Sequence, residues 1–342
     1  MNTPFNNEKY KKLQKDSIYK RIDKYEKLYI EVGGKLFDDF HAARVLPGFD
    51  PNVKMQIFRE IKDDIEIIFC INGRDIITKK VRSDNNLTYA DEIIRLTDIM
   101  HDEGIDVAGI MVNFYEDVEE IRDFTKKCGK KGVKVYRSYF IENYPNDLEY
   151  IASDKGFGRN DYIETNKKIV LVSAPGANSG KLETCLSQLY NDKINGIVSG
   201  YAKYETFPAW NLSLDHLVNV AYEMATADLC DKNMVDPFYQ NETGKTAVNY
   251  NRDIQSFPIL SNILKRIYGK KIYNSPTDMG INNVGNAIED DYEVQKASFE
   301  EIERRLTKCE RNHKEFKCSD KTLERSREVY CRAKEIFESL NQ

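Results

Sequence analysis

The sequence predicts an α/β fold: a mostly parallel, doubly wound sheet of the Rossmann-like or P-loop-like kind, with a C-terminal helical hairpin. Short apolar runs alternate with helical segments of ten or more residues in the first half of the chain. That alternation requires crossovers between parallel strands. The run Ile65–Ile71 is too apolar for a strand with one exposed face, so the sheet should be covered on both sides. After about residue 290, two stretches have apolar residues at helical spacing with a short turn between them, which predicts the hairpin.

The expected strands and helices follow one another in chain order. Five apolar runs are expected to be strands: Leu28–Val32, Ile65–Ile71, Val107–Phe114, Val133–Tyr136 and Ile169–Ser173. Apolar residues at a spacing of three or four predict helices over Lys9–Lys27, from about Asp38, and over Tyr89–His101, Val118–Cys128 and Leu182–Tyr190. In the hairpin, the apolar stripes run from Phe299 to Phe316 and from Leu323 to Leu340.

The length of the chain indicates more than one packed unit, because 342 residues exceed the ~250–300 at which a single hydrophobic core stops growing. We expect a Rossmann-like α/β domain over residues 1–165 and a helical hairpin over residues 289–342. Between them, residues 166–288 should form an α/β part that contains the phosphate loop. Its polar loops carry aromatic and charged side chains and are long, which is typical of binding or catalytic loops.

Charge and cysteine content exclude several classes of protein. The formal net charge is −5, whereas a general nucleic-acid binder needs a basic surface to displace counterions. No apolar run approaches the ~18–20 residues of a membrane span. The seven cysteines are odd in number and scattered, which is typical of reduced thiols in a cytoplasmic protein. We therefore expect a cytoplasmic protein that binds neither nucleic acid nor membranes.

The segment SAPGANSGK, residues 173–181, predicts a phosphate-binding loop. It follows the apolar run IVLVS and opens a helix, so backbone N–H groups, the positive end of a helix dipole and a lysine meet in one place. This context is more specific than the letters of the motif. The alternative is a glycine-rich turn whose lysine merely faces solvent. The residues expected to bind phosphate are Gly176, Asn178, Ser179, Gly180, Lys181 and Thr184.

The loop departs from the Walker A pattern in two ways. Three residues, not four, separate Gly176 from Gly180, and Leu182 stands where Ser or Thr would ligate Mg²⁺. Thr184, nearly a turn further along, and the aspartates Asp228, Asp231 and Asp236 are the candidates for reaching a metal instead. ATP with Mg²⁺ is the cofactor that the motif implies, but the identity of the phosphate compound stays open and no set of metal ligands is assigned.

Other loops supply candidate residues for the chemistry around a bound phosphate. A second glycine turn, Gly33–Lys35, follows the first strand, and parallel strands bring such turns to one edge of the sheet. Arg252 has the guanidinium geometry that binds phosphate or carboxylate. For each residue the alternative is a helix cap or a surface ion pair. The candidate catalytic residues are Lys181, Asp236 and Arg252, and the candidate substrate-binding residues are Gly33, Gly34, Lys35, Lys203, Glu205 and Asp278.

Five separated blocks of the sequence resemble one family. They are GGKLFDDFHAARVLPGF (Gly33–Phe49), SDKGFGRNDYIET (Ser153–Thr165), APGANSGKLETCLSQLY (Ala174–Tyr190), GYAKYETFPAWNL (Gly200–Leu212), and VNYNRD together with SPTDMG. The family is an uncharacterised bacterial family of unknown function, and the resemblance runs from about residue 8 to 305. Its members usually have GPGPGSGK where this chain has SAPGANSGK. Typical members also continue well beyond the last residue here, so the resemblance implies that the family's usual C-terminal domain is missing.

Some members of that family carry a label as ATP-dependent peptidases, which the residues here do not support, since the sequence contains no HExxH helix and no GxSxG elbow. The first hypothesis is an enzyme that binds ATP or another phosphorylated small molecule and transfers or hydrolyses a phosphate-linked group. The second is a non-catalytic module that senses a nucleotide or phosphometabolite. A third is a homo-oligomer built on the hairpin, which leaves the functional loops unexplained.

Overall fold

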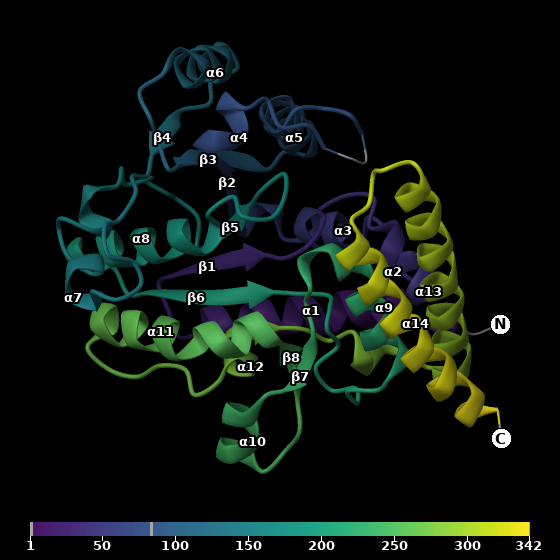
Figure 1. Ribbon diagram of the computed structural model, residues 1–342. Coiled ribbons are helices and arrows are strands. Elements are labelled where there is room, and N and C mark those ends of the chain that lie inside the picture. Colours follow the sequence, from purple (N-terminus) through teal and green to yellow (C-terminus); the bar gives the residue numbers. More distant parts are fainter. Residues whose placement is uncertain (1–2, 83–84, 342) are drawn as a thin grey trace.

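A seven-stranded parallel sheet forms the centre of the molecule (Figure 1). The computed structural model describes residues 3–82 and 85–341. The strand order is β4–β3–β2–β5–β1–β6–β9, and each neighbouring pair is parallel. The strands are β1 (Lys27–Val32), β2 (Ile65–Asn72), β3 (Asp106–Asn113), β4 (Val135–Arg137), β5 (Ile169–Ser173), β6 (Ser199–Tyr204) and β9 (Gly280–Ile281). The predicted α/β fold with a mostly parallel sheet is confirmed.

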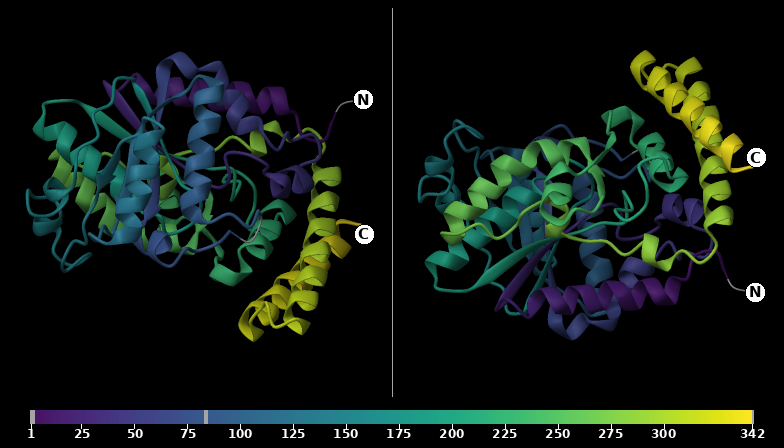
Figure 2. Two further views of the ribbon diagram at one scale, coloured as in Figure 1. Left: turned by 90° about the horizontal axis from the view of Figure 1, so that it is seen from above. Right: turned by 90° about the horizontal axis from the view of Figure 1, so that it is seen from below.

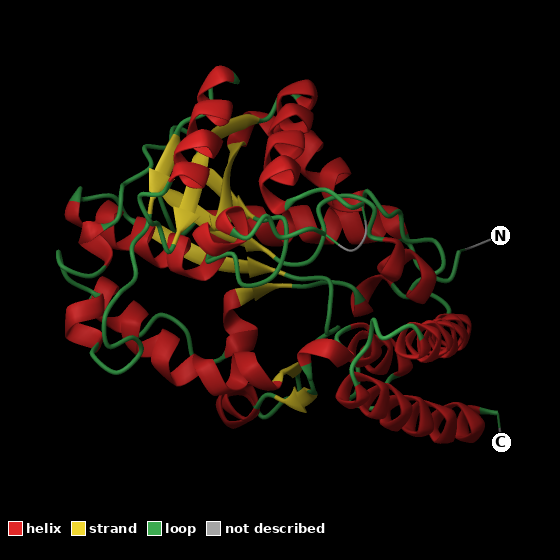
Figure 3. Ribbon diagram, turned by 45° about the horizontal axis from the view of Figure 1, so that its top comes forward, coloured by secondary structure: helices red, strands yellow, loops and turns green. Residues whose placement is uncertain are grey.

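Helices cover both faces of the sheet, and this is why its strands are apolar on both sides (Figure 3). In β1, for example, Ile30 belongs to the core on one face and the neighbouring Tyr29 to the core on the other. The first face carries α1 (Asn7–Ile22), α3 (Val53–Glu60), α4 (Gly73–Ile77), α5 (Tyr89–Glu103), α6 (Glu119–Lys130) and α9 (Leu217–Ala225). The opposite face carries α7 (Leu148–Ile151), α8 (Lys181–Ile194) and α11 (Asn251–Tyr268).

The chain changes direction between the adjacent strands β1 and β5. From β1 it crosses the first face, through α2 (Phe40–Val45) and α3, to reach β2. From β5 it crosses the opposite face, through α8, to reach β6. The loops that follow β1 and β5 therefore part at the carboxyl edge of the sheet, and this is where doubly wound sheets bind their ligands. Because β5 lies between β1 and β2, the boundary expected after residue 165 falls within one continuous sheet.

The remaining elements are short. A small antiparallel pair, β7 (Asn233–Val235) and β8 (Val248–Tyr250), precedes α11. Short helices are α10 (Pro237–Thr243) and α12 (Pro276–Met279), and single 3₁₀ turns are η1 (Lys62–Asp64), η2 (Phe157–Arg159), η3 (Ala227–Leu229) and η4 (Gly285–Ala287). Of the helices in the described ranges, none is both long and apolar enough to cross a membrane.

The predicted C-terminal hairpin is present as α13 (Asp291–Lys314) and α14 (Asp320–Leu340). It lies along one side of the molecule (Figure 2), where α13 contacts α2 and both helices contact α9. The two apolar stripes meet as expected: the rings of Phe299 and Phe337 are nearly parallel, with centroids 4.6 Å apart. The hairpin therefore touches the segment that follows β1, which leads away from the carboxyl edge of the sheet.

Candidate functional site

The predicted strand–loop–helix unit is present: β5 ends at Ser173, residues 174–180 form a loop, and α8 begins at Lys181. Gly180 is the N-cap residue of α8 and has a left-handed backbone, with φ = 84°. It supplies no side chain that could accept a hydrogen bond from the first-turn N–H groups. The positive end of the helix dipole thus lacks a side-chain cap, which is the arrangement that favours an anion.

The two glycines of the loop are required by its own packing. A Cβ atom on Gly180 would lie 2.4 Å from Cγ of Asn113, at the end of β3. A Cβ atom on Gly176 would lie 2.6 Å from the hydroxyl oxygen of Tyr89. The glycine pattern therefore reflects close contacts inside the protein, whereas the open helix end and Lys181 are the features that favour a ligand.

The two hydroxyls predicted to bind phosphate are directed into the protein. Ser179 is 1% exposed, and its Oγ donates to the carbonyl of Gly176 at 2.7 Å. Thr184 is fully buried, and its Oγ1 accepts from the thiol of Cys70 at 3.2 Å. The side chain of Asn113 donates to the carbonyl of Ser179 at 2.8 Å. These groups fix the shape of the loop, and the buried Thr184 has no open path to a metal.

Asn178 and Lys181 are the predicted phosphate-binding side chains that remain accessible. Asn178 is exposed at the tip of the loop, with a left-handed backbone at φ = 58°. Lys181 is half-buried and forms no ion pair with any residue in the described ranges. Burial raises the pKa of the Cys70 thiol to about 12, and the charges of Lys181 and Glu31 act on it with opposite sign. Lys181 and Glu31 therefore lie near the same buried thiol.

Four side chains on the same face form a group that we call the acidic cluster: Glu31, Lys203, Glu205 and Asp253. Lys203 Nζ lies 2.8 Å from a carboxylate oxygen of Glu205 and also pairs with Asp253. Glu31 is the register partner of Lys203 on the adjacent strand β1, and it accepts a hydrogen bond from the hydroxyl of Tyr201 at 2.7 Å. One ammonium group thus lies among three carboxylates at the carboxyl edge of the sheet.

Burial sets the protonation of this cluster. It raises the pKa of Glu205, because the charged form is disfavoured away from water, and the charge of Asp253 adds to this effect. Burial alone would lower the pKa of Lys203, but the charges of Asp253 and Glu205 raise it above its usual value. The second carboxylate oxygen of Glu205, Oε2, is buried and has no hydrogen-bond partner in the described part of the chain. Glu205 is therefore placed to hold or accept a proton.

Arg252 lies at the rim of the acidic cluster, next to Asp253 at the start of α11. Its guanidinium lies 3.4 Å from a carboxylate oxygen of Asp231 and 5.4 Å from the centre of the Tyr250 ring. The Arg252 side chain is half-exposed. Burial raises the pKa of Asp231, and the charge of Arg252 opposes that rise. Arg252 is thus held in place on one side while its outer part stays open to a ligand.

The predicted glycine turn after β1 lies beside the acidic cluster. The N–H of Gly33 donates to the carbonyl of Tyr204 at 2.8 Å, and a Cβ atom on Gly33 would lie 3.4 Å from Cγ of Glu205. Lys54 donates to the carbonyls of Gly33 and Lys35 at 3.1 and 3.0 Å. The lysine of the turn, Lys35, is exposed and has its own partner. The turn therefore belongs to the same edge as Lys203 and Glu205, as the sequence predicts, with Gly34 exposed next to it.

Two predicted site residues have other contacts. Asp236 is fully buried at the N-cap of α10: one oxygen accepts from two backbone N–H groups of α10 and the other from Thr277. Asp278 accepts from the N–H of Asn274 at 3.0 Å. It precedes β9, and since β9 is parallel to β6, it lies on the side away from the carboxyl edge. Both carboxylates are thus engaged in contacts away from the loop–helix site.

Two residues of the site were absent from the sequence-based set. Glu31 is the one acidic residue of the strand KLYIEV, which apart from Lys27 is otherwise apolar or aromatic, and a single acid in a strand covered on both faces is a signal that could have revealed it. Asn113 ends β3 and holds the loop through its side chain. Among the side chains in the described ranges, no group of three or more His, Cys, Asp or Glu is arranged to hold a metal ion.

The fold and this edge define a doubly wound α/β protein with a loop–helix unit beside a buried acidic cluster. The chain belongs to the family described as "Domain of unknown function DUF1846, N-terminal", whose model matches residues 3–334. The resemblance seen in the five sequence blocks is thereby confirmed.

Curated relatives agree with this assignment. The chain is 48% identical over 327 residues to the UPF0371 protein FN1121 of Fusobacterium nucleatum, covering 95% of this chain and 65% of the relative. It is 51% identical over 302 residues to a UPF0371 protein of Streptococcus sanguinis, covering 88% of this chain and 61% of the relative. The chain thus spans less than two thirds of the length of these bacterial relatives.

Proposed function

We propose that this chain binds a phosphate-bearing small molecule, either a nucleotide or a phosphorylated metabolite, at the β5–α8 loop. The observation that supports this proposal most strongly is the position of Lys181 and its charge, which is unpaired among the described residues. It lies at the open start of α8 and has no carboxylate partner in the described part of the chain, whereas Lys54, Lys203 and Arg252 near the same edge are each paired. A phosphate here would accept from the first-turn N–H groups and neutralise the ammonium charge.

The acidic cluster supports a catalytic role. A phosphate at Lys181 would lie on the same face as Glu31, Lys203 and Glu205. Glu205, with its raised pKa and an oxygen without a partner, suits the removal of a proton from an acceptor hydroxyl or water. Arg252 at the rim suits an anionic acceptor. We therefore propose transfer or hydrolysis of a phosphate-linked group, with Lys181 neutralising charge that develops on the phosphate.

A metal, if ATP with Mg²⁺ is the ligand, would be bound mainly through phosphate oxygens and water, as is common for Mg²⁺. Thr184 is buried and Asp236 serves as a helix cap. The second candidate is a non-catalytic sensor, and the inward direction of the Ser179 and Thr184 hydroxyls favours it. In that case the ligand would report through α9, which contacts both helices of the hairpin.

Thermal unfolding with a panel of nucleotides and sugar phosphates, with and without Mg²⁺, tests the binding proposal. A site tighter than ~10 μM should stabilise the fold by roughly 2.7 kcal/mol at about 1 mM ligand. Lys181→Ala should abolish this shift. Lys193→Ala, in the last turn of the same helix and away from the loop, is the matched control and should keep it. The proposal fails if no phosphate compound stabilises the wild-type protein.

Glu205→Gln separates the two candidate functions. The substitution keeps the shape of the side chain and removes its ability to accept a proton. If the protein is an enzyme, this variant binds the ligand found in the panel but turns it over at least about a hundredfold more slowly than wild type. If the wild-type protein binds the ligand and prolonged incubation yields no product, the sensor is the better description.

A further inference from the structure

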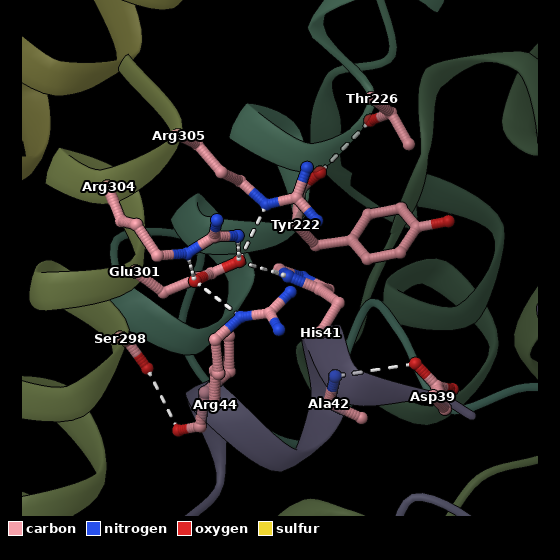
Figure 4. Close-up of polar contacts among 11 residues, drawn as sticks. Asp39, His41, Ala42, Arg44, Tyr222, Thr226, Ser298, Glu301, Arg304 and Arg305 are labelled. Atoms are coloured by element: carbon pink, nitrogen blue, oxygen red, sulfur yellow. Dashed lines mark hydrogen bonds and ion pairs between the residues drawn. The ribbon is translucent and has the colours of Figure 1, made fainter. Parts of the chain in front are cut away.

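A second group of charged residues lies where α2 meets α13 (Figure 4). Its centre is the carboxylate of Glu301. Arg44 Nε donates to it at 2.8 Å, Arg305 Nε at 2.8 Å, and Arg304 at 2.6 and 2.8 Å through Nε and Nη2. Nδ1 of His41 lies 3.2 Å from the same carboxylate. We call these five residues the arginine cluster.

The arginine cluster has an excess of positive charge. The Glu301 side chain is 1% exposed. Burial alone would raise its pKa, but hydrogen bonds from Arg304, His41 and Arg44 hold the pKa far below its usual value, so Glu301 is ionised. Burial lowers the pKa of His41, which is therefore neutral near pH 7. Three guanidinium charges against one carboxylate charge leave a formal charge of +2.

The two arginines that use only Nε keep donors for another acceptor. Arg44 and Arg305 reach Glu301 from different helices, and their terminal amino groups make no hydrogen bond with residues in the described ranges. The side chains of Arg44 and Arg305 are 41% and 26% exposed, so solvent and small ions can reach them. A guanidinium with both terminal nitrogens open presents the fork that binds phosphate oxygens.

A purely structural role does not account for three guanidinium groups at one carboxylate. Joining α2 to α13 needs a single arginine, whereas three repel one another. Burial lowers the pKa of Arg305, and the charges of Arg304 and Arg44 add to that effect. An arginine cannot relieve this repulsion by losing its proton at ordinary pH. A bound dianion would balance the charge and accept from the open donors.

We propose that Arg44, Arg304 and Arg305 form a second anion site, separate from the β5–α8 loop, which binds a phosphate dianion. The dianion is either inorganic phosphate or the phosphate group of a phosphomonoester. The site is built from α2 and α13, so it does not require ligand binding at Lys181.

Equilibrium dialysis at constant ionic strength tests this site, with inorganic phosphate and glycerol 3-phosphate as probes. The background is the Lys181→Ala variant, in which the loop lacks its cation. Arg44→Gln removes one open fork, and Arg304→Gln is a second variant at a more exposed position in case the first fails to fold. Arg327→Gln is the matched control, because Arg327 forms an exposed pair with Glu310 on the same hairpin.

We expect saturable binding in the Lys181→Ala background and in Arg327→Gln added to it. Arg44→Gln or Arg304→Gln should raise the Kd at least about tenfold, equivalent to about 1.4 kcal/mol. Binding of inorganic phosphate assigns the site to free phosphate, and binding of glycerol 3-phosphate alone assigns it to the phosphate of a larger ligand. The proposal is overturned if neither probe binds to the Lys181→Ala protein, or if both arginine variants bind as tightly as the control.

Glu301→Gln gives an independent measurement with the opposite sign. It removes the only carboxylate charge in the arginine cluster and should lower the Kd for phosphate, while making the protein without phosphate easier to unfold. Addition of phosphate should recover part of the lost stability. A cluster that only joins the two helices would lose stability in the same variant without any effect of phosphate, which contradicts the proposal.

Discussion

The acidic cluster and the arginine cluster have opposite compositions. In the first, one lysine lies among three carboxylates at the ends of β1 and β6 and the start of α11. In the second, one carboxylate lies among three guanidinium groups between α2 and α13. Both place charge where water is largely excluded, since Glu205 and Glu301 are almost fully buried.

The difference lies in how each cluster can relieve its repulsion. A buried carboxylate can take up a proton, and burial has already raised the pKa of Glu205 in that direction. An arginine does not lose its proton in proteins, so its excess charge has to be balanced by another ion. The acidic cluster is therefore suited to moving protons, and the arginine cluster to holding an anion. Four predictions test this contrast.

The largest effect is expected for Lys203→Met. This substitution leaves the buried Glu205 and the half-buried Asp253 without their partner, and breaking a buried pair from one side costs about 3–5 kcal/mol. Urea denaturation at neutral pH measures the loss. The cost should shrink at lower pH as Glu205 takes up a proton. A loss below about 1 kcal/mol would mean that the cluster is more hydrated than its burial indicates.

Glu301→Gln should have the next largest effect, about 2–3 kcal/mol in phosphate-free buffer. The loss is smaller because Arg44 and Arg304 are 41% and 45% exposed and can be hydrated when the carboxylate charge is gone. Glu310→Gln, which removes an exposed carboxylate from the same helix, is the control and should change stability by less than about 0.5 kcal/mol. Equal losses in the two variants would contradict the central place of Glu301.

The two clusters should respond to pH with opposite sign. Because the pKa of Glu205 is raised, its contribution to stability is complete below about 4.3, the ordinary glutamate pKa, and is lost as pH rises through its pKa in the fold. Because the pKa of Glu301 is lowered, its contribution is present above about 4.3 and is lost as pH falls towards its pKa in the fold.

Urea denaturation across pH measures this difference. Relative to wild type, Glu205→Gln should gain stability between about pH 5 and pH 8. The deficit of Glu301→Gln should shrink when pH falls below about 4.3. If both variants follow the wild-type pH profile, the pKa of Glu205 is not raised in the folded protein and the pKa of Glu301 is not lowered.

The smallest effect on stability is expected for Lys181→Ala, within about 0.5 kcal/mol of wild type without ligand. Lys181 has no carboxylate partner in the described part of the chain, so its removal leaves no buried charge unpaired. Comparison of Lys181→Ala with Lys203→Met distinguishes a lysine that stabilises the fold, Lys203, from a lysine that is available to bind a ligand, Lys181. A large loss would show that Lys181 has a structural role.

Much of the fold could be predicted because the spacing of apolar residues along the chain determines most of its strands and helices. The five apolar runs became β1 to β5, although β4 is shorter than expected, and the apolar stripes after residue 290 became the hairpin α13–α14. The loop between β5 and α8 could also be predicted from neighbouring residues in the sequence. Side-chain periodicity decides these elements, since a strand or a helix needs only its own neighbours to define its faces.

The candidate site could be predicted only in part. The loop at Gly176–Lys181 and the pair Lys203 and Glu205 were singled out from the sequence, but the packing of the loop glycines was not. Gly180 lies against Asn113 and Gly176 against Tyr89, residues that lie far away in the sequence. The acid in β1 was a signal for Glu31 itself, but nothing near Glu31 in the chain shows that Lys203 is its neighbour on the next strand.

The sequence by itself therefore determined the α/β class, the strand–loop–helix unit that carries Lys181, and the terminal hairpin. Only the tertiary structure decided that β5 lies between β1 and β2, that Lys203 meets Asp253, and that Arg44 meets Glu301. The physical reason is the range of the interactions. Periodicity acts over a few residues, whereas these pairs are separated by 50 and 257 positions and form only when packed layers bring them together.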